Sequence, residues 1–293
     1  MMEAFEDLVE NWQDYRTFKA GHQHTVVGTL KVLDDVRSAE LKNRRSILVY
    51  LPPSYNQVDK RFPVIYMHDG QNLFDQFTSF SGEWQVDETL EALSKEGLEA
   101  IVVGIPHAGE YRMAEYSPFV DGERGQGRGE AYLSFVVKAV KPLVERNFRT
   151  LDGKSHTGIM GSSMGGLISL YAFFRYPGIF GFAGALSPYV MFTSGALFKY
   201  VEQSPFNPGR VYLDVGTREE SHLRTDIARF HSLSRRYCDQ VRRMRDLLIK
   251  KGYIPGQSLL YVEDEGAIHH ESAWARRLPQ ALRFLLQSVA RST

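Results

Sequence analysis

Ser155-His-Thr-Gly-Ile-Met160 is followed by Gly161-Ser-Ser-Met-Gly165 and then by Gly166-Leu-Ile-Ser-Leu-Tyr-Ala-Phe-Phe-Arg-Tyr-Pro-Gly178. In this order the three runs predict a strand, a G-x-S-x-G turn and an apolar helix. Gly161 and Gly165 lack the Cβ atoms that would clash where the strand and the helix cross. Such a turn exposes the hydroxyl of its central residue, Ser163, beside the partial positive charge of a helix start. The stretch therefore predicts a nucleophilic serine.

The composition argues against several classes of partner. Among 293 residues, 35 basic side chains balance 35 acidic ones, so no net charge attracts the protein to nucleic acid or to an anionic membrane. One region is locally basic and is interpreted as a solvated helix face. It contains Arg235, Arg236, Arg242, Arg243 and Arg245.

Targeting signals and disulfides are not expected. The N-terminus is acidic and lacks the positive region of a secretory signal, and no apolar run approaches the ~20 residues of a membrane span. Cys238 is the single cysteine, which excludes an intrachain disulfide. We therefore expect a cytoplasmic protein that does not associate with membranes.

Strand and helix patterns alternate along the chain, which predicts the α/β class. The first two strands should form an antiparallel N-terminal hairpin, and the rest a mostly parallel central sheet with helices on both faces. We expect one domain over residues 1–293, including an N-terminal helical extension over 1–20 with a helix at 3–18. The predicted strands are 26–33, 45–51, 62–67, 100–105, 157–160, 181–186, 210–215 and 258–262. The other predicted helices are 83–94, 130–146 with a possible kink at Pro142, 237–251 and 272–289.

A serine nucleophile needs a base, usually a histidine oriented by a carboxylate. When the elbow serine comes first in the chain, the acid and the histidine follow on loops after later strands. One candidate loop is 216–220 and the other is 263–271. They offer His269 or His270 as the base and Glu219 as the preferred acid, with Asp214 and Glu220 as alternatives.

An oxyanion hole requires two backbone donors. The N–H of Met164 follows the nucleophile, and the N–H of Gln71 lies in the loop after the strand at 62–67. His68 and Asp69 in that loop lack further ligands at a recognisable spacing, so no metal is predicted. No cofactor is predicted either, because no strand leads into the glycine-rich stretch 121–130, which should be a flexible loop near the site mouth.

Substrate contacts are less specific in the sequence. Arg112, Glu115 and Tyr116 follow the strand at 100–105 and are candidates for binding a polar group; the alternative is an ordered loop with a local Arg–Glu pair. Four nearby aromatic residues are expected to pack the sheet edge rather than to line an acyl pocket. These are Phe74, Phe77, Phe80 and Trp84.

Several motifs together resemble one known family. They are Leu51-Pro-Pro-Ser-Tyr55, Phe62-Pro-Val-Ile-Tyr-Met-His-Asp-Gly-Gln-Asn72, Gly161-x-Ser163-Met-Gly-Gly166, Ser187-Pro188, Gly216-Thr-x-Glu219 and His269-x-Glu271-x-x-Trp274. The set is similar to the "Putative esterase" family, which includes enterochelin, feruloyl and acetylxylan esterases, S-formylglutathione hydrolases and mycolyltransferases. The resemblance covers about residues 22–288. It implies an α/β-hydrolase domain without a cap domain, and His269 rather than His270 as the catalytic histidine.

Three functions follow as hypotheses. The first is a serine carboxylic-ester hydrolase that acts on a small-molecule ester through an acyl-enzyme with a Ser-His-acid triad. The second is an acyltransferase that uses the same acyl-enzyme. The third is a non-catalytic binding module, against which the intact set of Ser163, His269 and Glu219 argues. The sequence does not indicate an oligomeric state.

Overall fold

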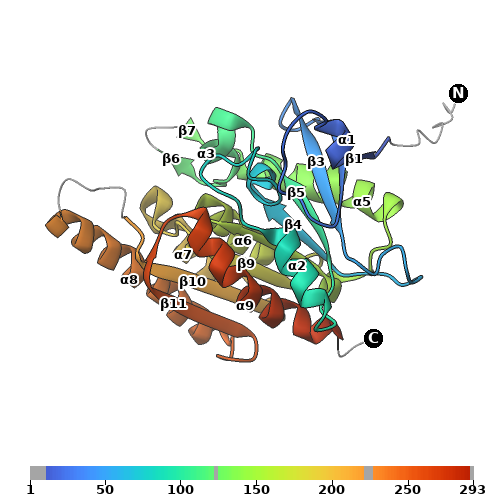
Figure 1. Cartoon of the computed structure of the whole chain (residues 1–293). Coiled ribbons are helices and arrows are strands. Elements are labelled where there is room, and N and C mark those ends of the chain that lie inside the picture. The colour runs from blue at the N-terminus through green and yellow to red at the C-terminus, as the bar shows by residue number, and fades with distance from the viewer. Residues whose placement is uncertain (1–10, 122–124, 221–226, 291–293) are drawn as a thin grey trace, which may run out of the picture.

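A central sheet dominates the fold. The computed structural model describes residues 11–121, 125–220 and 227–290, and within these ranges nine strands form one sheet in the order β1-β2-β3-β5-β4-β8-β9-β10-β11 (Figure 1). Their bounds are β1 Gln13–Asp14, β2 Thr29–Ser38, β3 Asn43–Leu51, β4 Val64–His68, β5 Ile101–Ile105, β8 Thr157–Ser162, β9 Phe182–Leu186, β10 Arg210–Arg218 and β11 Leu259–Ile268. A separate small ribbon pairs β6 (Val120–Asp121) with β7 (Gly125–Gln126).

The strand directions confirm the predicted α/β architecture. β2 and β3 form the expected antiparallel hairpin, and β3 also pairs antiparallel with β5. From β5 through β4, β8, β9 and β10 to β11, every neighbouring pair is parallel. The carboxyl ends of these six strands therefore lie along one edge of the sheet, where an α/β protein builds its site.

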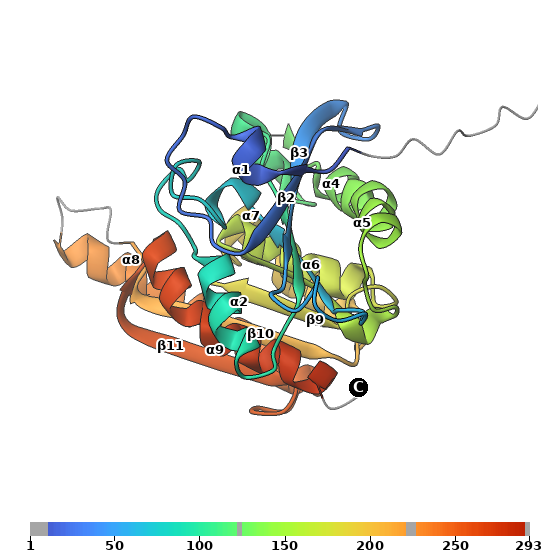
Figure 2. The same cartoon turned by 45° about the vertical axis from the view of Figure 1, so that its right-hand side comes forward.

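Helices cover both faces of the sheet (Figures 1 and 2). Alternating residues of β4 show the division: Ile65 and Met67 pack with α2 (Val86–Ser94) and α9 (Glu271–Ala290), whereas Tyr66 belongs to the opposite core. This period of two follows from the strand pleat. The opposite core is covered by α4 (Gly129–Phe135), α5 (Lys141–Asn147), α6 (Met164–Arg175), α7 (Phe192–Gln203) and α8 (Ile227–Lys251).

Two local expectations need correction. The helix expected at 3–18 begins outside the described residues, and within them Gln13–Asp14 is a strand and only Tyr15–Phe18 is helical (α1). Between α4 and α5 the helix widens into a π-turn over Val136–Val140, directly before Pro142 in the first turn of α5. Proline lacks an N–H and so cannot make the usual backbone hydrogen bond to the preceding turn. The helix accommodates Pro142 by widening into this π-turn, where a kink was expected.

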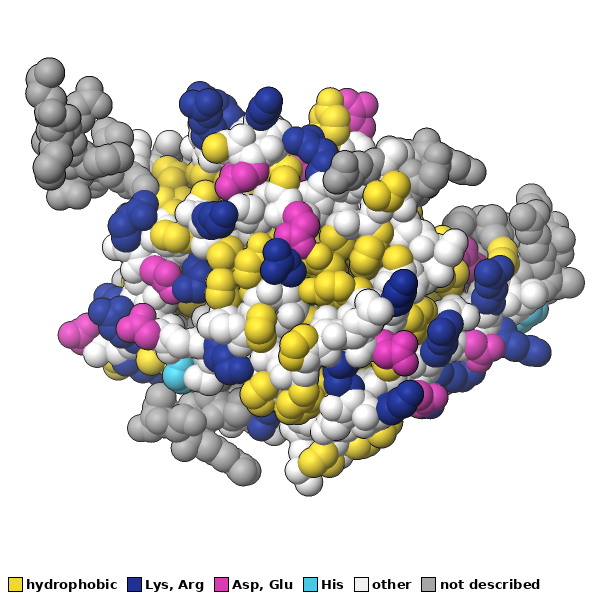
Figure 3. Space-filling view, turned by 180° about the vertical axis from the view of Figure 1, so that it is seen from behind, with side chains coloured by type: hydrophobic (Ala, Val, Ile, Leu, Met, Phe, Trp, Pro, Cys, Tyr) yellow, Lys and Arg dark blue, Asp and Glu magenta, His cyan; other side chains and the backbone are white. Residues whose placement is uncertain are grey.

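Charges on the surface are mixed. Seen from behind, basic and acidic side chains are interspersed around an apolar area (Figure 3). On α8 two arginines of the basic cluster form ion pairs: Arg242 with Asp239 and Glu263, and Arg245 with Asp246. None of the helices in the described ranges combines the length and apolar character needed to cross a bilayer.

Candidate active site

The turn at Ser163 has the sharp geometry that the G-x-S-x-G pattern predicts. It joins β8 to α6 with φ 56° and ψ −120°, a conformation that L-residues rarely adopt. The Ser163 N–H donates to the Leu186 carbonyl at 3.0 Å, which helps to hold the strained residue in place. A Cβ on Gly161 would lie 2.9 Å from the carbonyl carbon of Gly165, so the crossing of strand and helix requires glycine there.

The candidate acid and base follow directly after two paired strands. Arg218 at the end of β10 lies opposite Ile268 at the end of β11, so the next residues, Glu219 and His269, emerge side by side. Nδ1 of His269 lies 2.6 Å from Oε2 of Glu219. The Glu219 side chain is fully buried, while that of His269 retains 25% exposure. Most of the ranges 216–220 and 263–271, which were expected to be loops, are therefore strand. The loops begin only at Glu219 and His269.

The alternative acid and base have other partners. The Asp214 carboxylate accepts from Arg277 at 2.8 Å and from the Ser187 N–H at 2.8 Å. Burial raises the pKa of Asp214 to about 6. Nδ1 of His270 contacts the Ser272 hydroxyl at 2.9 Å, close to the start of α9. Among the candidates from the sequence, the structure therefore pairs Glu219 with His269.

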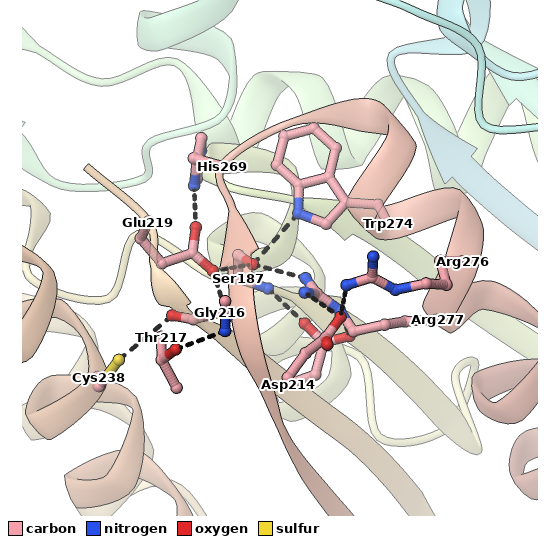
Figure 4. Close-up of polar contacts among 12 residues, drawn as sticks. Ser187, Asp214, Gly216, Thr217, Glu219, Cys238, His269, Trp274, Arg276 and Arg277 are labelled. Atoms are coloured by element: carbon pink, nitrogen blue, oxygen red, sulfur yellow. Dashed lines mark hydrogen bonds and ion pairs between the residues drawn. The ribbon is translucent and has the colours of Figure 1, made fainter. Parts of the chain in front are cut away.

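The second oxygen of Glu219 lies in a buried polar network (Figure 4). Its Oε1 accepts from the Ser187 hydroxyl at 2.6 Å and from the Gly216 N–H. The Ser187 hydroxyl also receives hydrogen bonds from Trp274 Nε1 at 3.2 Å and from Arg277 Nη2 at 2.8 Å. These contacts fix the carboxylate plane, which leaves Oε2 directed at His269.

The loop after β4 packs against the Ser163 turn. Asp69 has left-handed φ and ψ of 56° and 45°, and a short 3₁₀ turn over Gly70–Asn72 follows it. A Cβ on Gly165 would lie 3.3 Å from the His68 Cβ, which shows how closely the loop approaches the first turn of α6. Gln71 is tied to the next loop, because its Oε1 accepts from the His107 N–H at 3.2 Å. Gln71 and Met164, the expected oxyanion donors, thus belong to two segments that pack against each other.

His68 and Asp69 each have a protein partner. Nδ1 of His68 contacts the Tyr132 hydroxyl at 2.7 Å, and burial lowers the pKa of His68 to about 3, so the ring is neutral. Arg112 binds both oxygens of Asp69 at 2.8 Å. Burial alone would raise the pKa of Asp69, but the Arg112 guanidinium lowers it below its ordinary value. The Asp69 carboxylate is therefore charged and paired.

Several candidate residues line one cavity. Its volume of about 550 Å³ lies within the size range of small-molecule sites. Ser163 and His269 both line it, as does Arg112. Most of the other lining residues have polar side chains; the remaining wall comprises Asp69, Asn72, Ser81, His107, Gly109, Ser162, His270 and Glu271, with Phe80 and Trp274 as the aromatic members. Burial raises the pKa of Glu271.

Two of the expected substrate contacts lie elsewhere. The Glu115 side chain is completely buried and pairs with Arg45 at 2.9 Å, and Tyr116 is also completely buried. The Tyr116 hydroxyl accepts from the Asp69 N–H at 3.0 Å and thereby holds the loop after β4. Of the three candidates, only Arg112 lines the cavity. Sequence spacing placed the segment correctly but could not give the direction of its side chains.

Of the four aromatic residues expected to pack the sheet edge, two do so, and Phe77 is exposed instead. Phe74 and Trp84 are core residues, whereas Phe80 is 89% exposed and lines the cavity. The positions of Ser187 and Arg277 beside the acid were not predicted from the sequence. Ser187 was marked only by the family motif Ser187-Pro188, and Arg277 only by its place in the helix predicted over 272–289.

Comparisons with known proteins place the chain in a family. The family model described as "Putative esterase" matches residues 38–285. The uncharacterized protein YbbA of Bacillus subtilis is 30% identical over 252 residues, which cover 83% of this chain and 92% of YbbA. Among solved structures, the BES protein of Bacillus cereus has a TM-score of 0.66 at 21% identity, covering 90% of this chain and 97% of that one. The enterobactin esterase FES of Shigella flexneri has a TM-score of 0.68 at 20% identity, covering 90% of this chain and 60% of that one.

These neighbours share the α/β-hydrolase-type fold of the chain. The chain belongs to the "Putative esterase" family, as its sequence motifs indicated, and it is an esterase.

Proposed function

We propose that the protein is a serine carboxylic-ester hydrolase that works through an acyl-enzyme. The observation that carries the proposal is the 2.6 Å contact between His269 and Glu219, with His269 and Ser163 lining one cavity. A nucleophile, a base and an orienting carboxylate are the parts that acyl transfer to serine needs. The mechanism requires no metal or cofactor.

Each residue has a definite role in this proposal. His269 Nε2 takes the proton of the Ser163 hydroxyl as its oxygen attacks the ester carbonyl, and the backbone N–H groups of Met164 and Gln71 bind the oxyanion. The tetrahedral intermediate collapses when His269 gives its proton to the leaving alcohol. Water then attacks the acyl-serine by the same route and releases the acid. Glu219 stabilises the imidazolium that forms at each step.

The cavity wall supports a small, polar ester as substrate. Arg112 is the one expected substrate contact that reaches the cavity, and Asn72 and His107 add polar groups beside it. Because Asp69 already neutralises Arg112, its guanidinium can donate hydrogen bonds to a substrate without requiring a negative charge on it. We propose that Arg112 binds a polar oxygen of the acyl or alcohol part.

The test is hydrolysis of p-nitrophenyl acetate and butyrate by the wild type and by Ser163→Ala. Ser81→Ala is the matched control, because Ser81 lines the same cavity but lies outside the proposed triad. Wild-type turnover that only Ser163→Ala abolishes, down to a weak background, supports the proposal. Equal turnover by Ser163→Ala and the wild type, both folded by circular dichroism, would rule out Ser163 as the nucleophile.

A further inference from the structure

We propose that Ser187 and Arg277 are positioning residues for the triad. They orient the Glu219 carboxylate so that its Oε2 accepts a hydrogen bond from His269, and they thereby fix the tautomer of His269. The inference rests on the proposed function, because it concerns the acid and base of that mechanism. The evidence is the assignment of hydrogen-bond donors and acceptors in the buried network of Figure 4.

The Ser187 hydroxyl has one proton to donate and two lone pairs to accept with. Trp274 Nε1 and Arg277 Nη2 approach its oxygen at 3.2 Å and 2.8 Å. Neither group can accept a hydrogen bond, so both lone pairs are occupied by donors. The remaining neighbour is Oε1 of Glu219 at 2.6 Å, so the hydroxyl proton must point there.

This donation decides the direction of the next hydrogen bond. Oε1 of Glu219 receives both the Ser187 hydroxyl and the Gly216 N–H, so no proton can reside on that oxygen. The Arg277 guanidinium, 4% exposed, places a buried positive charge one hydroxyl away from this oxygen. Oε2 is then an acceptor, and His269 Nδ1 at 2.6 Å must carry the proton. Its Nε2 is left bare, which is the form that a general base needs.

Arg277 is itself held in place from the other side. Its Nε donates to Asp214 Oδ2 at 2.8 Å, and its Nη1 lies 3.3 Å from Asp264. Asp214 also accepts from the Ser187 N–H and from the Tyr212 hydroxyl. One buried carboxylate therefore orients both Arg277 and the backbone of Ser187, whose φ of 40° is otherwise unfavourable.

The first experiment compares Ser187→Ala with Ser38→Ala. Ser38 is an equally buried serine, but it lies in the N-terminal hairpin and its oxygen accepts from the Leu41 N–H. We expect Ser187→Ala to lower kcat for p-nitrophenyl acetate about 10- to 100-fold, as for loss of a charge-assisted hydrogen bond, with KM within about threefold of the wild type. Ser38→Ala should change kcat by less than about twofold.

Proton NMR gives a readout that general destabilisation would not change in the same way. The far-downfield resonance of the His269 Nδ1–H, identified by its loss in Glu219→Ala, should shift or broaden in Ser187→Ala and persist in Ser38→Ala. A folded Ser187→Ala that keeps both the wild-type kcat and this resonance overturns the role of Ser187.

Arg277 variants keep the inference testable if Ser187→Ala does not fold. Arg277→Lys retains a cation and should keep more activity than the neutral, similarly long Arg277→Met. Equal kcat in the two folded variants, with the resonance unchanged, overturns the role of Arg277. Ser163→Ala separates the two proposals: if it retains turnover, the proposed function fails, whereas if it is inactive while Ser187→Ala is normal, only the present inference fails.

Discussion

Glu219→Gln should inactivate the enzyme although glutamine has nearly the same shape as glutamate. Oε1 of Glu219 faces two donors, the Ser187 hydroxyl and the Gly216 N–H, so the amide oxygen of the glutamine must occupy that position. The amide NH₂ then faces His269. Because an NH₂ group can only donate, Nδ1 of His269 must accept, and its proton moves to Nε2. A histidine protonated at Nε2 cannot take the proton of Ser163.

The magnitude follows from the loss of this general base. In serine hydrolases the wrong histidine tautomer lowers kcat by about 10⁴-fold. At about 1.36 kcal/mol for each factor of ten, this corresponds to about 5 kcal/mol of transition-state stabilisation. Turning the amide over does not rescue the enzyme, since the NH₂ group would then oppose two buried donors, each costing about 1–3 kcal/mol.

The assay is the kcat of Glu219→Gln on p-nitrophenyl acetate, with folding checked by circular dichroism and thermal unfolding. Glu265→Gln makes the same chemical change on an exposed position of β11 and serves as the control. A folded Glu219→Gln with a kcat within tenfold of the wild type would refute the tautomer argument.

Three further predictions concern stability. Gly70→Ala should lower the free energy of unfolding by about 1–3 kcal/mol in urea titrations, because its Cβ would lie 2.7 Å from the backbone of Gly104 and Ile105. Ser163→Gly should be about 1–3 kcal/mol more stable than Ser163→Ala in the same assay, since glycine tolerates φ 56°. Burial raises the pKa of Glu83 to about 7 and of Asp87 to about 9, so the folded state binds protons that the unfolded state releases. Stability should therefore fall as pH rises from about 4 to 9, and thermal unfolding of Glu83→Gln/Asp87→Asn should show a smaller decrease.

Each stability prediction has a control. Gly178→Ala meets no atom within 4 Å of its new Cβ and should change stability by less than about 0.5 kcal/mol. Equal urea midpoints for the two Ser163 variants would show that the turn is not strained. An unchanged pH slope in the double variant would mean that other groups cause the pH dependence.

The sequence predicts best where the signal is local. The strand, turn and helix around Ser163 follow from residues that are neighbours in the chain, and they are present as predicted. β11 was predicted to end at Val262 but continues to Ile268. It is an edge strand, so the charged residues Glu263, Asp264 and Glu265 can continue it without being buried. The apolar pattern therefore stops before the strand does.

Side-chain directions in the loops depend on distant residues. Glu115 is turned into the protein by Arg45, which lies 70 residues earlier in the chain. Ser187 reaches Arg277 across 90 residues. No spacing rule within either segment predicts these contacts. The sequence therefore indicated which segments meet at the site, but not which of their side chains would reach the cavity.

The strand order has a consequence for how the chain could be divided. β1 to β5 lie on one side of the pairing between β4 and β8, and β8 to β11 lie on the other. Asp69 and Arg112 come from the first half, whereas Ser163 and His269 come from the second. If the chain is divided between Asn147 and Thr157, each of the two fragments contains strands that are neighbours in the sheet. Neither fragment contains the complete cavity wall. Ester turnover by the two fragments together would show that they have associated. The boundary between β4 and β8 is therefore a suitable place to divide the enzyme into a split reporter.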